Sequence, residues 1–372
     1  MASRSKKVAP AGKEPVESIR KRIDSVDRQL HELINQRAAL AREVGISKHA
    51  QGHVVDYYRP EREAEVLRMA LERNSSGTLR DEEILRLFRE IMSACLAQEK
   101  PLKVAYLGPE GTFSQSAVFK QFGHSVRALA LASIDEVFQE VQAGNADFGI
   151  VPVENSSEGV VNNTLDRFLT TSLNICGEVE LRVHHNLLGK MKDLSKVLRV
   201  CAHPQALAQC RIWLDEHLPD AERVPVSSNA EGARRARDEQ GTGAVAGDVA
   251  AEVYGLTILA PQIEDHEDNT TRFLVIGNRK LGSSGFDRTS LLAAGDKATS
   301  GSLFRLLEPL AKYKINMTRI ESRPSRRRKW DYVFFIDLEG HAEDPHVAKA
   351  LLELKKRSSM LRVLGSYPRA IL

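Results

Sequence analysis

The sequence predicts a multidomain protein with an all-α unit, a central α/β unit and a C-terminal α+β unit. Residues 17–100 show only helical periodicity, with little glycine or proline. Residues 102–279 alternate between short apolar runs and helical segments, as is typical of βαβ units. The last block reads as the ferredoxin-like order βαββαβ. Its elements are expected at residues 289–294, 301–313, 316–322, 332–338, 345–356 and 361–367.

Composition limits the classes of protein that remain possible. With 53 basic and 50 acidic side chains among 372 residues, the charge is too balanced to indicate a nucleic-acid partner. No apolar run approaches the roughly 18 residues of a membrane span, and no apolar core follows the basic N-terminus, so we expect a cytoplasmic protein. The cysteines show no CxxC spacing, which favours reduced core thiols and no metal site. They are Cys95, Cys176, Cys201 and Cys210.

The first predicted helix places cations in its apolar stripe. Apolar residues recur every three or four positions from Ile19 to Leu33 and again at Leu40, so Arg37 stands where an apolar residue belongs. Lys48 lies within about 20° of Arg37 around such a helix. One possibility is that these long side chains extend into solvent or form ion pairs with acidic partners. The other is that together they bind a dianion. A helix of about 33 residues is too long for a three-helix unit to cover alone, so we expect a partner chain to bury its stripe.

Four predicted strands of the central block end in polar or glycine-rich segments. Ligands of open α/β sheets bind beyond the carboxyl ends of the strands, so we expect these ends to converge on one cleft. The turn at 108–114 opens a helix, and its backbone N–H groups form a seat for an anion. The hydroxyls of Thr112 and Ser114 either contact the ligand or only cap that helix. The strands are 104–107, 148–153, 197–202 and 244–246, followed by 108–114, 154–159, 203–205 and 247–248.

Short motifs along the chain resemble those of known families. Residues 17–24, 36–37, 58–63 and 88–92 are similar to the all-helical class of chorismate mutases. Residues 108–114, 151–166 and 271–273 resemble prephenate dehydratases, and Glu321-Ser322-Arg323-Pro324 is similar to the signature of ACT regulatory domains. In this order the motifs resemble the bifunctional chorismate mutase/prephenate dehydratase family of phenylalanine biosynthesis. The resemblance covers essentially everything after residue 15.

The resemblance implies a domain organisation and a set of ligands. After a flexible tail at 1–14, we expect a three-helix mutase domain at 15–100 that forms an intertwined dimer. A dehydratase domain at 101–280 is expected to have two lobes that resemble type 2 periplasmic-binding folds, with crossovers near 175–187 and 257–265. An ACT domain is expected at 286–372. Chorismate and prephenate are the implied substrates and phenylalanine the effector, in a homodimer or larger homo-oligomer without a cofactor.

For the mutase, the resemblance implies a site made of cations and hydrogen-bond donors, since the rearrangement needs no nucleophile. Arg37 and, from the partner subunit, Arg20 are implied to bind the two carboxylates. Lys48 is implied to donate to the ether oxygen, and Glu63 to hold the ring hydroxyl. The implied substrate-binding set also contains Arg59 and Cys95.

Two positions depart from the pattern of the mutase relatives. Arg59 stands where many of them have aspartate, and Glu99 stands where many have glutamine. Only a neutral acid can donate to the developing oxyanion, so with Glu99 as a catalytic donor mutase turnover should decline as pH rises. The alternative is that Glu99 is a solvated acid at a fraying helix end.

For the dehydratase, the resemblance implies hydrogen bonding by Thr271 near the departing hydroxyl and binding of a substrate carboxylate by Arg272. Each residue also has a structural explanation. Glu154 would cap the next helix, Arg272 would pair with Asp265 or Glu267, and His203 would be a strand-end histidine rather than a base. The implied catalytic residues are Glu154, Asn155 and Thr271, and the implied binding residues are Thr112, Ser114, Ser156, Gln209 and Arg272.

The C-terminal block contains no acid–base set, and its resemblance to ACT domains implies regulation by bound phenylalanine. Ser302 stands where relatives commonly have alanine, which adds a hydroxyl that needs a partner. The alternative is a purely structural dimerisation domain. Two rival functions of the whole chain also stay open: a non-catalytic small-molecule sensor, and an enzyme with only one live activity. The implied effector residues are Gly301, Ser302, Leu303, Glu321, Ser322, Arg323 and Pro324.

Overall fold

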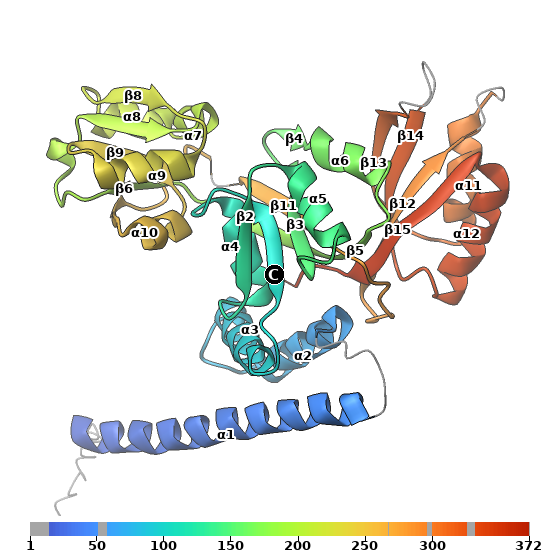
Figure 1. Cartoon of the computed structure of the whole chain (residues 1–372), viewed down its shortest axis with the longest axis horizontal. Helices are drawn as coiled ribbons and strands as arrows, with labels where there is room; N and C mark the ends of the chain where they lie inside the picture. Colours follow the sequence, from blue (N-terminus) through green and yellow to red (C-terminus); the bar gives the residue numbers. More distant parts are fainter. Residues whose placement is uncertain (1–14, 51–57, 267, 296–299, 326–331, 372) are drawn as a thin grey trace, which may run out of the picture. The chain divides into compact units, whose positions relative to one another are not determined.

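The computed structural model describes residues 15–50, 58–266, 268–295, 300–325 and 332–371, without the side chains of residues 48–50 (Figure 1). The expected tail at 1–14 therefore lies outside the described residues. The chain divides into two compact units, Met1–Tyr57 and Tyr58–Leu372.

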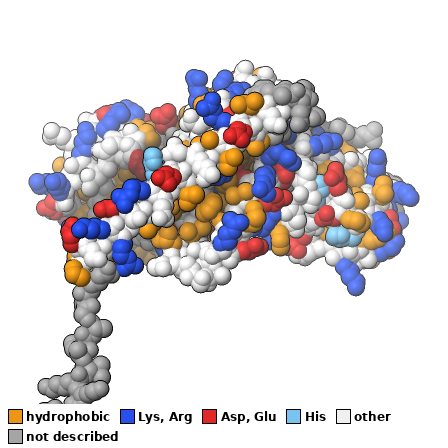
Figure 2. Space-filling view, turned by 90° about the horizontal axis from the view of Figure 1, so that it is seen from below, with side chains coloured by type: hydrophobic (Ala, Val, Ile, Leu, Met, Phe, Trp, Pro, Cys, Tyr) orange, Lys and Arg blue, Asp and Glu red, His pale blue; other side chains and the backbone are white. Residues whose placement is uncertain are grey.

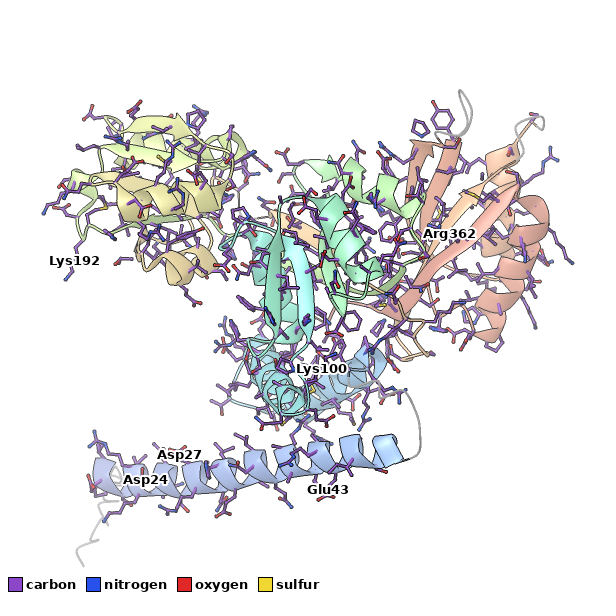
Figure 3. All side chains as sticks on the ribbon, viewed as in Figure 1. Asp24, Asp27, Glu43, Lys100, Lys192 and Arg362 are labelled. Atoms are coloured by element: carbon purple, nitrogen blue, oxygen red, sulfur yellow. The ribbon has the colours of Figure 1, made fainter. Side chains whose placement is uncertain are left out.

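The described part of the first unit forms one long helix, α1, over Val16–Ala50. Its 35 residues confirm the long first helix that the periodicity predicts. In the single chain the apolar stripe is solvent-exposed, with Ile23 at 53% and Leu33 at 60% exposure. Acidic side chains such as Asp24, Asp27 and Glu43 project from the same helix (Figure 3). A stripe of this length and exposure needs another surface to cover it.

Two further helices open the second unit: α2 at Pro60–Arg73 and α3 at Asp81–Ala97. Proline at the first position of α2 suits a helix start, because its missing N–H has no partner there in any case. Just before α2, the ring of Tyr58 is buried against Phe122 and Phe148 of the next domain. These aromatic contacts anchor the start of α2 to the central α/β region.

The first sheet of the central region has the order β2-β1-β3-β11-β5, with the short β4 paired to β3. Strand β1 runs parallel to β2 and β3, whereas β11 lies antiparallel between β3 and β5. The strands are β1 Lys103–Leu107, β2 Arg127–Leu131, β3 Phe148–Asn155, β4 Gly159–Val160, β5 Asn174–Arg182 and β11 Thr270–Gly277. The helices of this lobe are α4 Phe113–Phe122, α5 Ile134–Gln142 and α6 Asn162–Phe168.

A second sheet, of order β10-β6-β9-β7-β8, forms the other lobe. The chain enters it after β5 and leaves it before β11, near the two expected crossovers, and this confirms the two-lobed prediction. The strands are β6 Asn186–Gly189, β7 Arg199–Ala202, β8 Glu222–Pro225, β9 Thr242–Ala246 and β10 Thr257–Ala260. The helices are η1 Leu194–Lys196, α7 Pro204–Gln209, α8 Arg211–His217, α9 Asn229–Asp238 and α10 Asp248–Tyr254.

The C-terminal domain is a four-stranded sheet of order β13-β14-β12-β15 with α11 and α12 on one face, which confirms the βαββαβ prediction (Figure 1). Its other face joins the core of the first lobe through residues such as Phe335 and Tyr367. A Cβ on Gly365 would lie 2.1 Å from the carbonyl oxygen of Ile175, so glycine permits the close approach of β15 to β5. The elements are β12 Asp287–Ala294, α11 Ser302–Lys312, β13 Met317–Pro324, β14 Tyr332–Glu339, α12 Pro345–Arg357 and β15 Met360–Pro368.

The distribution of surface charge and the state of the cysteines match what the composition predicts. Basic and acidic side chains are mixed on the face that Figure 2 displays, with exposed hydrophobic side chains between them. All four cysteines are buried and unpaired, as predicted, and burial raises the pKa of Cys176 to about 12. Among the described residues, no helix has both the length and the apolar character that crossing a membrane requires.

Candidate active sites and the interdomain ion network

The four polar strand ends of the central region converge on one cavity of about 450 Å³. Gly108 after β1, Asn155 at the end of β3, His203 after β7 and Gly247 after β9 all line it. This confirms that the strand ends meet. The volume lies within the range of about 300–1,000 Å³ that small-molecule sites usually have.

The turn before α4 forms one wall of this cavity. Thr112 is the N-cap residue of α4, but its hydroxyl donates to the carbonyl of Leu107 at 3.2 Å and makes no cap hydrogen bond. The capping explanation of the Thr112 hydroxyl is therefore wrong. Gly111 has a φ of 84°, and a Cβ there would lie 2.9 Å from the ring of Tyr254. Only glycine meets both conditions at this turn.

Asn155 and Thr271 form the polar centre of the cavity. The Asn155 side-chain oxygen accepts from the backbone N–H groups of Ser157 and Glu158, each at 3.0 Å. Because backbone N–H groups only donate, this contact settles which way the amide points. Its nitrogen then donates to the Thr271 hydroxyl oxygen and to the side-chain oxygen of Asn269, both at 2.8 Å. The Thr271 oxygen already accepts this bond, so its own proton is left for another acceptor in the cavity.

The same chain of hydrogen bonds reaches a buried histidine. The Asn269 nitrogen donates to the Gln209 side-chain oxygen at 3.1 Å, so the nearby His185 Nε2, at 2.8 Å from that oxygen, is also a donor. Burial lowers the pKa of His185, which keeps the ring neutral with its proton on Nε2.

Sequence reasoning missed several residues of this cavity. Asn269 directly precedes Thr270-Thr271-Arg272, which contains implied site residues, and this neighbourhood could have identified Asn269 as a site residue. His185 lies in the short polar segment 184–186 between Val183 and Leu187, and polar residues between apolar neighbours also mark buried polar groups. His203 lines the cavity, and its Nδ1 also accepts from the Gln205 N–H as the N-cap of α7, as its structural explanation predicts. Phe113, Glu158 and Gln205 also line the cavity and lie within the predicted strand-end segments, whereas the polar lining residues Ser227, Ser228 and Asn229 were missed.

Three implied site residues do not line the cavity, and this corrects their expected placement. Side chains alternate along a strand, so Glu154 and Arg272 point away from the face that carries Asn155 and Thr271. Glu154 pairs with Arg319 at 3.0 Å instead. It does not cap α6 either, because the N-cap residue of α6 is Val161. Ser156 bonds to the backbone instead: its hydroxyl donates to the Asp268 carbonyl and accepts from the Thr270 N–H.

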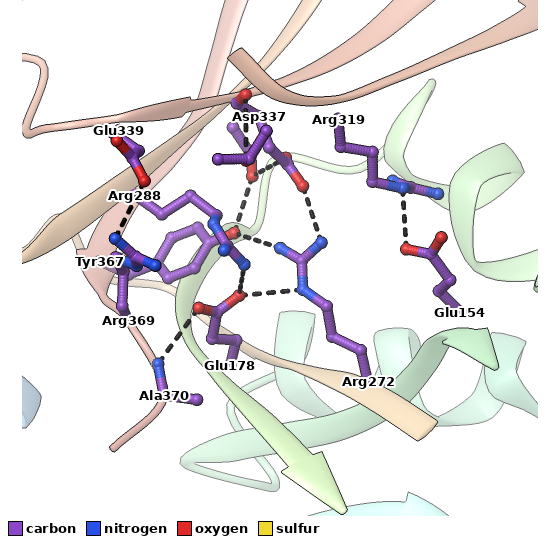
Figure 4. A network of polar contacts seen from close by, with 12 residues as sticks. Glu154, Glu178, Arg272, Arg288, Arg319, Asp337, Glu339, Tyr367, Arg369 and Ala370 are labelled. Atoms are coloured by element: carbon purple, nitrogen blue, oxygen red, sulfur yellow. Dashed lines mark hydrogen bonds and ion pairs between the residues drawn. The ribbon is translucent and has the colours of Figure 1, made fainter. Parts of the chain in front are cut away.

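Arg272 belongs to a buried ion network between the central region and the C-terminal sheet (Figure 4). Its guanidinium donates to Glu178 at 2.9 Å, to Asp337 at 2.8 Å and to the Tyr367 hydroxyl at 3.2 Å. Arg288 also pairs with Glu178. The expected alternative partner Asp265 instead accepts from backbone N–H groups at the start of α8, and Glu267 lies outside the described residues.

The two arginines and two carboxylates of this network balance in charge. Burial lowers the pKa of Arg272, but Tyr367, Asp337 and Glu178 together raise it above its usual value. The guanidinium therefore remains charged in the folded protein. A buried charge of this kind is tolerated only while its partners stay in place.

The implied mutase residues are divided between the two units. Arg20 and Arg37 lie on α1, where Arg20 is exposed and Arg37 partly buried, and the side chain of Lys48 lies outside the described residues. Arg59, Glu63, Cys95 and Glu99 belong to the second unit.

Glu63 has an unusual environment within the second unit. Burial raises the pKa of its carboxyl group to about 7, although Arg89 and a hydrogen bond with Tyr58 oppose the rise. Arg59, by contrast, pairs with Glu61 at 2.8 Å, and Cys95 is buried. Glu99 follows the last turn of α3, where its N–H donates to the Leu96 carbonyl, and its side chain is partly buried.

The implied effector residues lie at two places in the C-terminal domain. Gly301 is the N-cap residue of α11 with a φ of 73°, a left-handed conformation that favours glycine, and Ser302 and Leu303 begin the helix. Glu321, Ser322, Arg323 and Pro324 end the edge strand β13. Arg323 is engaged with the dehydratase-like lobe, because it pairs with Asp166 at 2.9 Å.

A long helix, a two-lobed α/β domain with a polar-centred cavity and a ferredoxin-like domain together place the chain in the class of multidomain proteins with a small-molecule site between two lobes. Family models match in the same order: "Chorismate mutase type II" at 19–100, "Prephenate dehydratase" at 104–281 and "ACT domain" at 298–356. The bifunctional chorismate mutase/prephenate dehydratase of Stutzerimonas stutzeri is 52% identical over 96% of this chain and 98% of its own length. The chain belongs to the bifunctional chorismate mutase/prephenate dehydratase family, as the motifs indicate.

Solved structures resemble the dehydratase and ACT portion. Prephenate dehydratase from Arthrobacter aurescens, in complex with L-Phe, has a TM-score of 0.67 and 35% identity over 72% of this chain and 90% of its own. GqqA, described as a novel type of quorum-quenching acylase, has a TM-score of 0.66 and 32% identity over 72% of this chain and 98% of its own. One fold therefore accompanies two described activities, so the fold alone does not determine the reaction.

Proposed function

We propose that the chain rearranges chorismate to prephenate with its helical residues and then dehydrates and decarboxylates prephenate to phenylpyruvate in the interlobe cavity. We assign the mutase to residues 15–100, the dehydratase to 101–280 and the ACT domain to 286–372. The observation that carries the second activity is the hydrogen bond from Asn155 to Thr271, which leaves the Thr271 proton free to bond a ligand oxygen.

The dehydratase reaction needs a donor at the ring oxygen that leaves and a seat for the substrate carboxylates. Thr271 supplies the donor, and Asn155 and Gln209 hold it in one orientation through their amide chain. Ser114 and the N–H groups at the start of α4 supply the carboxylate seat, where the helix dipole favours negative charge. This seat replaces the role first given to Arg272, whose guanidinium is occupied elsewhere.

The mutase reaction needs cations around a compactly held dianion. We assign carboxylate binding to Arg37 and to Arg20 of a second copy, and donation to the ether oxygen to Lys48. Glu63, Arg59 and Cys95 complete the binding site, and Glu99 donates in its neutral form. The apolar stripe of α1 is exposed within its own unit, and we assign its cover to a second copy, in a homodimer or larger assembly.

We assign feedback inhibition of the dehydratase to phenylalanine bound by the ACT domain. Phenylalanine binds at the start of α11, through Gly301, Ser302 and Leu303, and at the end of β13, through residues 321–324. The family match to ACT domains and the resemblance to a dehydratase crystallised with L-Phe support this assignment. We place the enzyme in the cytoplasm as a soluble biosynthetic protein.

Incubation of the purified chain with chorismate tests the proposal directly. Prephenate should appear first and phenylpyruvate second, and phenylalanine should slow the second step. Accumulation of prephenate without phenylpyruvate would leave only the mutase live. Binding of prephenate without turnover would favour the sensor instead.

A further inference from the structure

The dehydratase site touches the ACT domain through the immediate neighbours of its two central residues. Strands β3 and β11 pair Asn155 with Thr271 and, one position along, Glu154 with Arg272. The first pair lines the cavity, whereas the second pair faces the ACT sheet. Because adjacent residues of a strand share a rigid backbone, a shift of the outer pair moves the inner pair as well.

Each member of the outer pair is held by an ACT residue (Figure 4). Arg319 on β13 bonds Glu154 at 3.0 Å, and Asp337 on β14 bonds Arg272 at 2.8 Å. Asp337 in turn accepts from Ser290 of β12 at 2.6 Å, which ties it to the middle of the ACT sheet. Two neighbouring ACT strands thus contact the two dehydratase strands that carry the cavity residues.

Strand β13 also carries the segment to which effector binding is assigned. Arg319, Glu321 and Arg323 lie at alternate positions, so they share the face that is turned toward the dehydratase. Arg323 pairs with Asp166 of α6 at 2.9 Å, four residues along the strand from Arg319. A ligand that displaces or tightens the end of β13 therefore acts on both arginine contacts.

The Arg319 pair is poorly explained by stability alone. The Arg319 side chain is only 12% exposed, and its Nη2 atom has no hydrogen-bond partner in the described part of the chain. Its partner Glu154 is 39% exposed, so loss of Arg319 leaves a carboxylate that water can solvate, and a partly exposed pair of this kind contributes only about 0–1 kcal/mol. The pair is thus positioned to transmit a change of β13 rather than to hold the fold.

We propose that Arg319 is a positioning residue that the ACT domain supplies to the dehydratase, and that it transmits effector binding on β13 to Asn155 through Glu154. The inference rests on the proposed function and names the route of its regulation. Arg272 and Asp337 form the second contact of the same route. Neither arginine touches the substrate; both act through the strands that carry the residues which do.

The test compares Arg319→Met and Arg319→Lys with Arg362→Met in the full chain. Arg362 on β15 is the matched control, because it also joins the ACT domain to the dehydratase but donates to the carbonyls of Phe168 and Thr171, outside β3 and β11 (Figure 3). Prephenate turnover is measured with and without saturating phenylalanine. Calorimetry without substrate gives phenylalanine affinity, and mutase turnover and melting temperature report on the rest of the chain.

In Arg319→Met, the factor by which phenylalanine lowers dehydratase turnover should shrink by at least about threefold, while phenylalanine still binds within about twofold of its usual affinity. Without effector, kcat should fall by about three- to tenfold with KM less affected, since misplacement of a catalytic group acts on the transition state. Arg319→Lys keeps the charge, so it should recover part of the phenylalanine inhibition and part of the kcat. Arg362→Met should keep full inhibition.

Unchanged inhibition in Arg319→Met, with phenylalanine bound, would overturn the inference and leave the proposed function standing. Equal loss of inhibition in Arg362→Met would also overturn the inference, because loss of any contact between the two domains would then weaken inhibition. If the unaltered chain turns over prephenate without inhibition by phenylalanine, the regulatory route fails. If the unaltered chain does not turn over prephenate, the proposed function fails together with the inference.

Discussion

Asn155 and Thr271 are register partners on β3 and β11, and the Asn155 amide donates to the Thr271 hydroxyl at 2.8 Å. The bond has a fixed direction because backbone N–H groups hold the other end of the amide. It aligns a hydroxyl donor in the cavity, and the donor itself carries no charge. A neutral donor suits the departure of a ring hydroxyl from a substrate that already carries two carboxylates.

Thr271→Ala should lower dehydratase kcat by about 10²- to 10³-fold, because loss of one aligned donor typically costs about 3 kcal/mol of transition-state stabilisation. Thr271→Ser keeps the hydroxyl and should retain most of the turnover. Mutase turnover of both variants, measured with chorismate, should match the unaltered protein. Full dehydratase turnover in Thr271→Ala would remove Thr271 from the mechanism.

Glu99→Gln should change the pH dependence of the mutase. A carboxylate cannot donate to the developing oxyanion and only the neutral acid can, so turnover of the unaltered enzyme should decline as pH rises. The amide donates at every pH, so the variant should lose much of that decline. Superimposable kcat–pH profiles of the two proteins would show that Glu99 is only a solvated acid at the end of α3.

Glu63 should make the folded state less stable as pH rises toward neutrality. Its folded pKa of about 7 lies above the ordinary value, so between about pH 4.5 and 7 the folded state holds a proton that the unfolded state has lost. The free energy of unfolding should therefore fall over this interval, by on the order of 1–3 kcal/mol, and level off above it. Glu63→Gln should remove this slope from urea titrations. An equal slope in the variant would assign it to other groups.

Removal of Arg272 should destabilise the contact between the dehydratase and ACT domains. Arg272→Met leaves Glu178 and Asp337 with one arginine between them, and breaking a buried pair in this way typically costs about 3–5 kcal/mol. Urea unfolding measures this loss. Restoring neutrality with Asp337→Asn in the same chain should recover part of it. A loss no larger in Arg272→Met than in the exposed-pair variant Arg211→Met would show that the network is not stabilising.

Much of the architecture could be predicted because local patterns decide it. The apolar spacing from Ile19 to Leu33 determines α1, and the alternating patterns of the last block determine its six elements. The convergence of the strand ends at Gly108, Asn155, His203 and Gly247 follows from the general geometry of open α/β sheets. Asn269 and His185 were missed because their roles depend on hydrogen-bond partners that are distant in sequence.

The sequence by itself determined the order of the domains, the family and the residues that stand at the strand ends, since these are properties of short segments. Only the tertiary structure decided that Thr271 faces the cavity while Arg272 faces the ACT sheet. Alternation along β11 dictates that the two side chains point apart, but which side holds the cavity depends on what packs against each face. The packing of both lobes and of the ACT domain against β11 determines which face lines the cavity, and this packing cannot be read from any single segment of the chain.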